Sequence, residues 1–217
     1  MKRAIMHIAA IVFSLTTISL YAAGTEEIPL GGLTVPEAFQ RLEKPEIMAD
    51  DALLDTKIEE AFYGRQTEAI RFAINSLRSP RIQNIDGNRV DRTFDLRAAK
   101  RIFQKFPADA LDLLKKEYLT GNATLRENII QAVGGMAAED EVRPMLIAAL
   151  DDKAFSDEED PEMEGDPLRV CDNAYNQLVL RYSIKDVLRT IGAAHRIEIR
   201  DYHIEILKEK FLSGAVS

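Results

Sequence analysis

A Leu-Arg dipeptide followed by the same apolar pattern occurs three times in this chain, in segments 95–106, 124–135 and 167–178. In the first and third of these Leu-Arg segments, apolar residues stand 1, 2, 5, 6 and 9 positions after the arginine; in the middle one the pattern is shifted by two residues. This spacing puts the apolar side chains on one broad face of a helix. Recurrence of one helical unit favours an array in which each unit buries its apolar face against the next.

Two further helical patterns lie between the Leu-Arg segments, at 108–119 and 140–152. The three arginines are 29 and 43 residues apart, and the excess of 14 matches an acidic stretch at 153–166. We therefore interpret 93–217 as helical repeats that carry an acidic insertion at 153–166 and end in a capping helix at 196–212. Another helix is predicted from Ser183 to Gly192, because apolar residues between them fall at helical spacing.

The preceding region, 25–92, is predicted to form N-terminal helices followed by a polar loop. Thr34 and Glu37 form a capping-box pattern, so a helix is expected to follow Thr34. Two more helical stripes lie at 54–62 and 69–77. The polar stretch 81–92 contains Asp86-Gly87 between two short alternations, which would suit a small hairpin. We favour an irregular connection there.

The first residues have the layout of a secretory signal peptide. Lys2 and Arg3 precede an apolar stretch, and small residues end at Gly24. We predict cleavage of residues 1–24 and a periplasmic or secreted protein, with no stable membrane insertion afterwards. The alternative is an uncleaved anchor, although the strongly apolar core is shorter than the roughly 20 residues of a spanning helix.

Charge and cysteine content restrict the function further. Cleavage removes two basic residues and no acidic ones, so the net charge goes from −8 to −10. An acidic chain without clustered Lys and Arg is poorly suited to nucleic acid or to an anionic membrane surface. The single cysteine, Cys171, lies on an apolar stripe, which indicates a buried thiol rather than a nucleophile. Because a single cysteine cannot form a disulfide within the chain, stability must come from apolar packing.

With these features the chain resembles bacterial HEAT-like repeat proteins. The segment 124–152 is closest to their pattern, with Leu-Arg opening a helix, Gly134-Gly135 after it, and Pro144 in the next helix. The resemblance covers about 93–181. It implies an all-α fold: a short α-α superhelix, or HEAT-like solenoid, with an N-terminal helical cap. The second helix of each pair would line the concave surface.

The three arginines have two interpretations under this resemblance. Arg97, Arg126 and Arg169 would form a basic row for an anionic partner, or each would bond to an aspartate in a turn. We favour the aspartates, because guanidinium groups inside a packed array need partners. The available ones are Asp95, Asp151, Asp152 and Asp166.

The third Leu-Arg segment and the residues after it carry further candidate binding residues. They are the polar residues beside its apolar stripe: Asn173, Asn176, Gln177 and Arg181. Side chains with several donors and acceptors suit peptide or protein recognition. An ordinary solvated helix face is the alternative.

Metal sites have weaker support in the sequence. The stretch 156–166 holds seven carboxylates but lacks the spacing of a calcium loop, so we interpret it as a solvated insertion. His195, Asp201 and His203 match no zinc spacing. We therefore expect no resident metal and no cofactor.

We expect an exported scaffold that binds a protein or peptide, and not an enzyme, since no serine-centred elbow, phosphate loop or paired His-Glu motif appears. The alternative is a cell-envelope enzyme or metal-binding protein that uses the His195–His203 region. A third interpretation is a structural repeat in a larger envelope assembly. The sequence leaves the oligomeric state open.

Overall fold

The structure is a computed structural model in which residues 28–79, 82–85, 88–91, 93–155 and 165–216 are described. Helices make up nearly all the regular structure of these residues, which confirms the predicted all-α class. In chain order the elements are η1 (Leu30–Gly32), α2 (Val35–Leu42), α3 (Pro45–Met48), α4 (Asp51–Phe62), α5 (Gln66–Ser76), β1 (Ile82–Ile85), β2 (Asn88–Asp91), α6 (Thr93–Lys105), α7 (Pro107–Thr120), α8 (Ala123–Val133), α9 (Glu139–Ala149), α10 (Val170–Tyr182) and α11 (Ile197–Leu212).

The predicted capping box is confirmed in the N-terminal region, and a second helix there begins at a side-chain cap. Helix α2 begins with a capping box, in which Thr34 Oγ1 accepts from the Glu37 N–H and Glu37 Oε2 accepts from the Thr34 N–H at 3.0 Å. Helix α4 begins at an aspartate cap, where Asp50 Oδ1 accepts from the Ala52 N–H at 2.8 Å. Both caps satisfy donors that have no partner within the helix.

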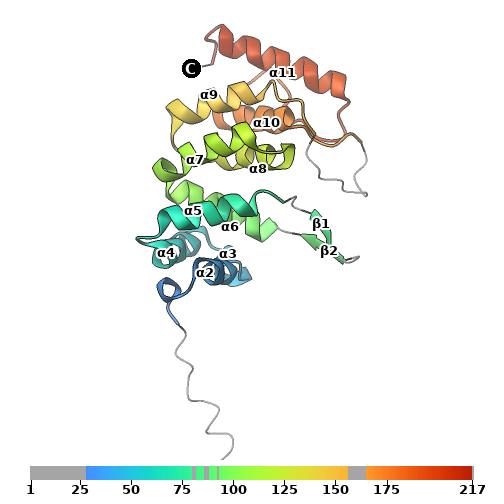
Figure 1. Ribbon diagram of the computed structural model, residues 1–217. Coiled ribbons are helices and arrows are strands. Elements are labelled where there is room, and N and C mark those ends of the chain that lie inside the picture. The colour runs from blue at the N-terminus through green and yellow to red at the C-terminus, as the bar shows by residue number, and fades with distance from the viewer. Residues whose placement is uncertain (1–27, 80–81, 86–87, 92, 156–164, 217) are drawn as a thin grey trace, which may run out of the picture.

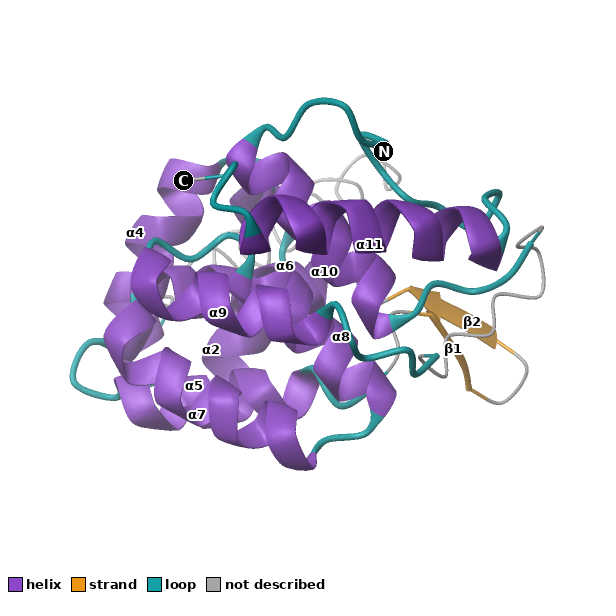
Figure 2. Cartoon of the chain, turned by 90° about the horizontal axis from the view of Figure 1, so that it is seen from above, coloured by secondary structure: helices purple, strands orange, loops and turns teal. Residues whose placement is uncertain are grey.

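Helices that follow one another in the chain pack as neighbours. Helix α5 contacts α6, α7 contacts α8, and α9 contacts α10. Contacts also run from α4 to α6, from α6 to α8 and from α8 to α10, while α5 contacts α7. In Figure 1 the helices succeed one another from α2 at the bottom to α11 at the top. Helix α11 packs on α10 and lies nearest the viewer in Figure 2.

The apolar pattern of the Leu-Arg segments forms the core between these helices. The buried members are Ala98, Ala99, Ile102, Phe103, Ile129, Ile130, Val133, Val170, Cys171, Ala174, Tyr175 and Leu178. Only Phe106 of the predicted set is partly exposed. The two-residue shift in the middle segment does not disturb this packing, since its apolar side chains are also fully buried. Apolar burial of this kind is the main favourable contribution to folding.

The irregular connection that we favoured for 81–92 is wrong. Strands β1 and β2 pair antiparallel, with Ile82 opposite Asp91 and Ile85 opposite Asn88. This pairing agrees with the hairpin that the sequence offered as the alternative. Asp86 and Gly87 themselves lie outside the described residues. Figure 2 shows the hairpin projecting to one side of the helices.

The helix predicted between Ser183 and Gly192 is also wrong. Ser183 adopts a left-handed conformation with φ 48°, and the Ile184 N–H bonds to the Val179 carbonyl at 3.2 Å. The Ser183 N–H bonds to the Leu180 carbonyl, which completes a Schellman motif and ends α10. A second left-handed residue, Asp186 with φ 63°, prevents a new helix. Residues 183–196 are therefore irregular.

Within the described ranges, no helix combines the length and the apolar character needed to cross a membrane. The predicted signal peptide, 1–24, lies outside the described residues, as does most of the acidic stretch, 156–164.

Candidate functional site

The third Leu-Arg segment begins its helix differently from the other two. Arg97 and Arg126 lie inside α6 and α8, but Arg169 is the extended residue that precedes α10, with φ −93° and ψ 165°. Arg169 also forms an isolated antiparallel bridge with Phe155, across the base of the acidic insertion. Its side chain turns inward and is 3% exposed, so this arginine belongs to the interior.

Around Arg169 lies a buried charge cluster, defined here as Arg169, Asp172, Arg200 and Asp201. Asp172 is fully buried and accepts from both arginines: Oδ1 is 2.9 Å from Arg169 Nη2, and Oδ2 is 3.0 Å from Arg200 Nη1. Asp201 Oδ1 forms an ion pair with Arg169 Nη2 at 2.8 Å, and Oδ2 accepts from Lys153 at 3.0 Å. Each buried charge of the cluster thus has a partner of opposite sign, as buried charges require, and the cluster reaches the surface at Asp201, which is 33% exposed.

Arg200 uses all five of its N–H donors. Besides Asp172 it donates to four backbone carbonyls, those of Asp166, Pro167, Ala193 and His195, at 2.7–3.0 Å. This one side chain therefore joins α11 to the end of the acidic insertion, to α10 and to the irregular segment. Arg200 was not predicted to have this role, although its position between Ile197 and Ile204 places it on the apolar stripe of α11.

Burial and charge shift the pKa values of groups in and beside this cluster. Burial alone lowers the pKa of the Arg169 guanidinium, but its contacts with Asp172 and Asp201 outweigh this and raise it above its usual value. Burial likewise acts to raise the pKa of Asp201, while Arg169 and Lys153 lower it by more. Burial, reinforced by Asp172, raises the pKa of the Cys171 thiol to about 12. At neutral pH this thiol is protonated and a poor nucleophile.

The other two Leu-Arg arginines bond to aspartates nearer the surface. Arg126 forms a bidentate pair with Asp152 at 2.6 and 3.1 Å, and Arg97 pairs with Asp51 at 2.8 Å. Of the predicted acceptors whose side chains are described, Asp151, Asp152 and Asp166, only Asp152 pairs with one of the three arginines. All three guanidinium groups are occupied by carboxylates within the molecule, an arrangement that suits structural roles better than a basic row.

Three of the four polar candidates from the third Leu-Arg helix are also engaged within the molecule. Asn173 donates to Glu127 at 3.0 Å. Asn176 binds both backbone groups of Ile191, accepting from its N–H at 2.7 Å and donating to its carbonyl at 2.9 Å. Arg181 donates to the carbonyls of Gly134 and Met136. These contacts position helices and loops.

Gln177 differs from these three. Its amide makes no hydrogen bond with any part of the chain that the structure describes, and it lies against Gly134. A Cβ atom at position 134 would come within 2.1 Å of Gln177 Oε1, so a larger residue there would force the Gln177 side chain to move. Gln177 is therefore the one polar candidate on α10 whose hydrogen-bonding groups are available to a ligand.

The two C-terminal histidines also contact backbone. The Gly192 N–H donates to His195 Nδ1 at 3.1 Å, and the Leu188 N–H lies 3.5 Å from His203 Nδ1. Across the described ranges, no group of three or more His, Cys, Asp or Glu side chains is placed to hold a metal ion. The histidines thus help to position the irregular segment, as Asn176 does. The carboxylates of the possible calcium loop fall mostly at 156–164, outside the described residues.

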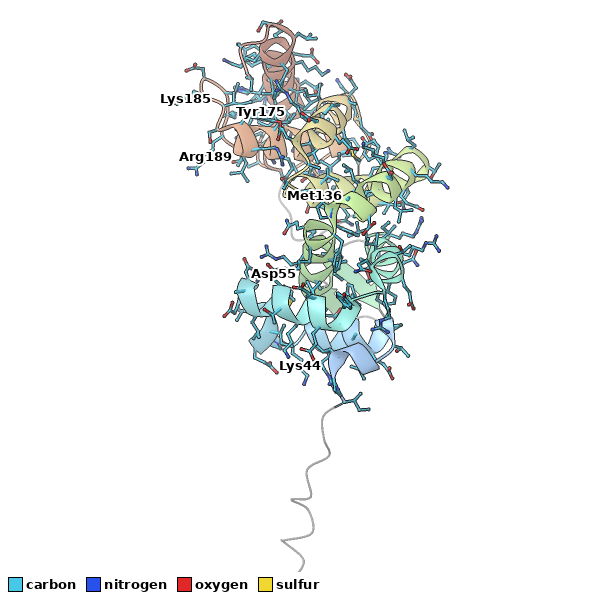
Figure 3. The ribbon with its side chains drawn as sticks, turned by 90° about the vertical axis from the view of Figure 1, so that its left-hand side faces the viewer. Lys44, Asp55, Met136, Tyr175, Lys185 and Arg189 are labelled. Atoms are coloured by element: carbon cyan, nitrogen blue, oxygen red, sulfur yellow. The ribbon has the colours of Figure 1, made fainter. Side chains whose placement is uncertain are left out.

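A groove lies between the end of α10 and the irregular segment, and we call it the C-terminal groove. Its volume is about 490 Å³, and its lining residues are Asn176, Gln177, Val179, Leu180, Ser183, Ile184, Val187, Arg189 and Thr190. Leu180 is 71% exposed and lies beside the apolar residues Val179, Ile184 and Val187 of the lining. Figure 3 shows Arg189 projecting outward near the upper part of the molecule, as does the neighbouring Lys185. Sequence analysis had identified two of these lining residues, Asn176 and Gln177.

Comparison of the chain with models of known protein families, with curated protein sequences and with solved structures gives no match. Any functional assignment therefore rests on the geometry described above.

Proposed function

We propose that this chain is an exported HEAT-like repeat protein that binds a protein partner through the C-terminal groove. The observation that carries the proposal is the groove itself. It combines an exposed leucine, partly buried Ile184 and Val187, and the unbonded amide of Gln177. Protein interfaces typically have such an apolar centre with polar groups at the rim.

The repeat interpretation has support in the order of the helix contacts. Each of the pairs α5–α6, α7–α8 and α9–α10 contacts the next pair along the chain, and α6, α8 and α10 form a continuous row. Repeat arrays have this pattern, because each unit contacts mainly its neighbours. Arrays of stacked helices commonly act as binding surfaces, which favours a scaffold over an enzyme.

A matched pair of leucine substitutions tests the binding proposal. Leu180 is 71% exposed in the groove, whereas Leu119 is 83% exposed at the end of α7, outside it. We expect tagged wild-type protein and Leu119→Glu to capture the same protein from a cell-envelope extract, and Leu180→Glu to lose it. Equal capture by all three would remove the groove from the proposal, and no capture by the wild type would contradict the scaffold function.

Export has a separate test, because it depends on residues 1–24. We expect the purified native protein to begin after Gly24 when its N-terminus is sequenced, and to fractionate with periplasmic or secreted proteins. Full-length protein in the membrane fraction would instead indicate a retained anchor.

A further inference from the structure

The irregular segment presents unbonded backbone groups beside the C-terminal groove. Its inward-facing groups are occupied: the Leu188 carbonyl accepts from Tyr175 at 2.6 Å, and Ile191 is held by Asn176. The N–H groups of Val187, Arg189 and Thr190, which line the groove, donate to no described residue. The backbone bends at Val187 and Arg189, so these N–H groups do not form the edge of a strand, but each can donate to a carbonyl of a bound peptide.

The apolar part of the groove gives such a peptide an anchor. Leu180 rises from the last turn of α10, and Ile184 and Val187 face the groove from the irregular segment. An apolar side chain of a bound peptide would cover these three, and each Å² of apolar surface so buried contributes about 25 cal/mol. The fixed position of the segment reduces the entropy lost on binding.

The charge of the groove indicates which peptides fit. Arg189 is the only charged residue of its lining, and the lining contains no carboxylate. Arg189 is exposed and forms no ion pair with a described residue, and Figure 3 shows its side chain pointing away from the body. The chain as a whole has a net charge of −8, so this groove is locally opposite in sign to the rest. A carboxylate on the bound segment would pair with Arg189.

We infer that the C-terminal groove binds a peptide segment in which an apolar side chain stands next to a carboxylate. The peptide lies against Val187–Thr190, accepts from their free N–H groups, covers Leu180 with its apolar side chain, and bonds to Arg189 through its acid. This inference rests on the proposed function and specifies the chemistry of its partner.

Three fluorescent peptides of equal length test it by anisotropy with the full purified protein. They alternate leucine with glutamate, glutamine or lysine. We expect the glutamate peptide to bind about tenfold more tightly than the lysine peptide. Arg189→Glu should remove this preference, and Arg189→Gln should weaken it. Lys116→Glu makes the same charge change on an exposed, unpaired residue of α7 and should leave the preference intact.

Each contrary result has a distinct meaning. If the wild type binds all three peptides equally and Leu180→Glu binds none, the preference for an acidic peptide is overturned. Binding in the groove would still stand. Equal effects of Arg189→Glu and Lys116→Glu would overturn it too, because only the overall charge would then matter. If no peptide binds while a partner protein is still captured through Leu180, the peptide inference fails and the proposed function stands.

Discussion

Charged side chains join two pairs of helices in this molecule, α4 with α6 and α10 with α11. The two sets of charges differ in how deeply they are buried. An ion-pair row links α4 to α6: Arg97–Asp51, Arg101–Asp55 and Lys105–Glu59, at 2.8, 2.5 and 3.0 Å. All of its side chains are at least 28% exposed. In the buried charge cluster, Arg200 and Asp172 are both fully buried. Exposed pairs adjust an interface that apolar packing already makes, whereas buried charges fix one arrangement and cannot be left unpaired.

The difference follows from what each region lacks. Between α4 and α6, complete apolar stripes meet, and charges are needed only at the edge. The chain between α10 and α11 has no helix, so side chains must satisfy its backbone groups although its apolar residues pack on the core. Arg200, Asn176 and Tyr175 do this by bonding to the carbonyls of Leu188, Ile191, Ala193 and His195. The C-terminal groove exists because these contacts hold one of its walls.

The largest effect is expected from Leu146→Asp, which tests whether apolar packing holds the helical region. Leu146 is fully buried in α9, and the new carboxylate would have no partner there. We expect loss of the cooperative thermal transition in circular dichroism, whereas Leu119→Asp, at an exposed site, should unfold like the wild type. A folded Leu146→Asp with an unchanged midpoint would contradict this packing.

The next effect concerns the buried charge cluster. Asp172→Asn leaves the positive charges of Arg169 and Arg200 without their shared carboxylate, and we expect it to lower the free energy of unfolding by about 3–5 kcal/mol in urea denaturation. Asp112→Asn, on an exposed residue of α7, should change it by less than about 0.5 kcal/mol. If Asp172→Asn also cost less than about 1 kcal/mol, the cluster would behave like a surface pair and the comparison would fail.

The smallest stability effect is expected in the ion-pair row. Arg101→Ala removes a bidentate contact with Asp55, and we expect a loss of about 0.2–1 kcal/mol that shrinks as salt is added. A double-mutant cycle with Asp55→Ala isolates the pair. A coupling energy above about 2 kcal/mol, insensitive to salt, would place this pair in the same class as the buried cluster.

Sequence patterns predicted the helices well where an apolar stripe meets a clear cap. The stripes of α6, α8 and α10 are buried as predicted, and the Thr34 cap is confirmed. The prediction failed after Ser183. This serine adopts the left-handed conformation that ends α10, a position usually occupied by glycine, so nothing in the sequence indicated the helix end. The apolar residues of this segment pack on the core, as Ile191 does, and their spacing in the sequence is the same as in a helix. Their backbone is nevertheless held by side chains from distant positions, which the spacing does not reveal.

The candidate site was less predictable than the fold. Asn176 and Gln177 were identified from their polar character, but one is structural and the other is free, and only three-dimensional contacts separate them. The ion-pair row between α4 and α6 leaves a trace in the sequence. Each helix carries three like charges at i, i+4 spacing: Asp51, Asp55 and Glu59 in one, and Arg97, Arg101 and Lys105 in the other. That the acidic residues of α4 face the basic residues of α6 depends on how these two helices pack, which the local sequence does not determine.

Hydrogen exchange at two neighbouring amides tests most directly whether side chains hold the wall of the groove. The Ile191 N–H bonds to Asn176 Oδ1 at 2.7 Å, whereas the Thr190 N–H has no acceptor among the described residues. After correction for intrinsic rates, we predict that Ile191 exchanges at least about tenfold more slowly than Thr190 in the wild type, and that Asn176→Ala removes most of this protection. Equal exchange of the two amides in the wild type would contradict the account.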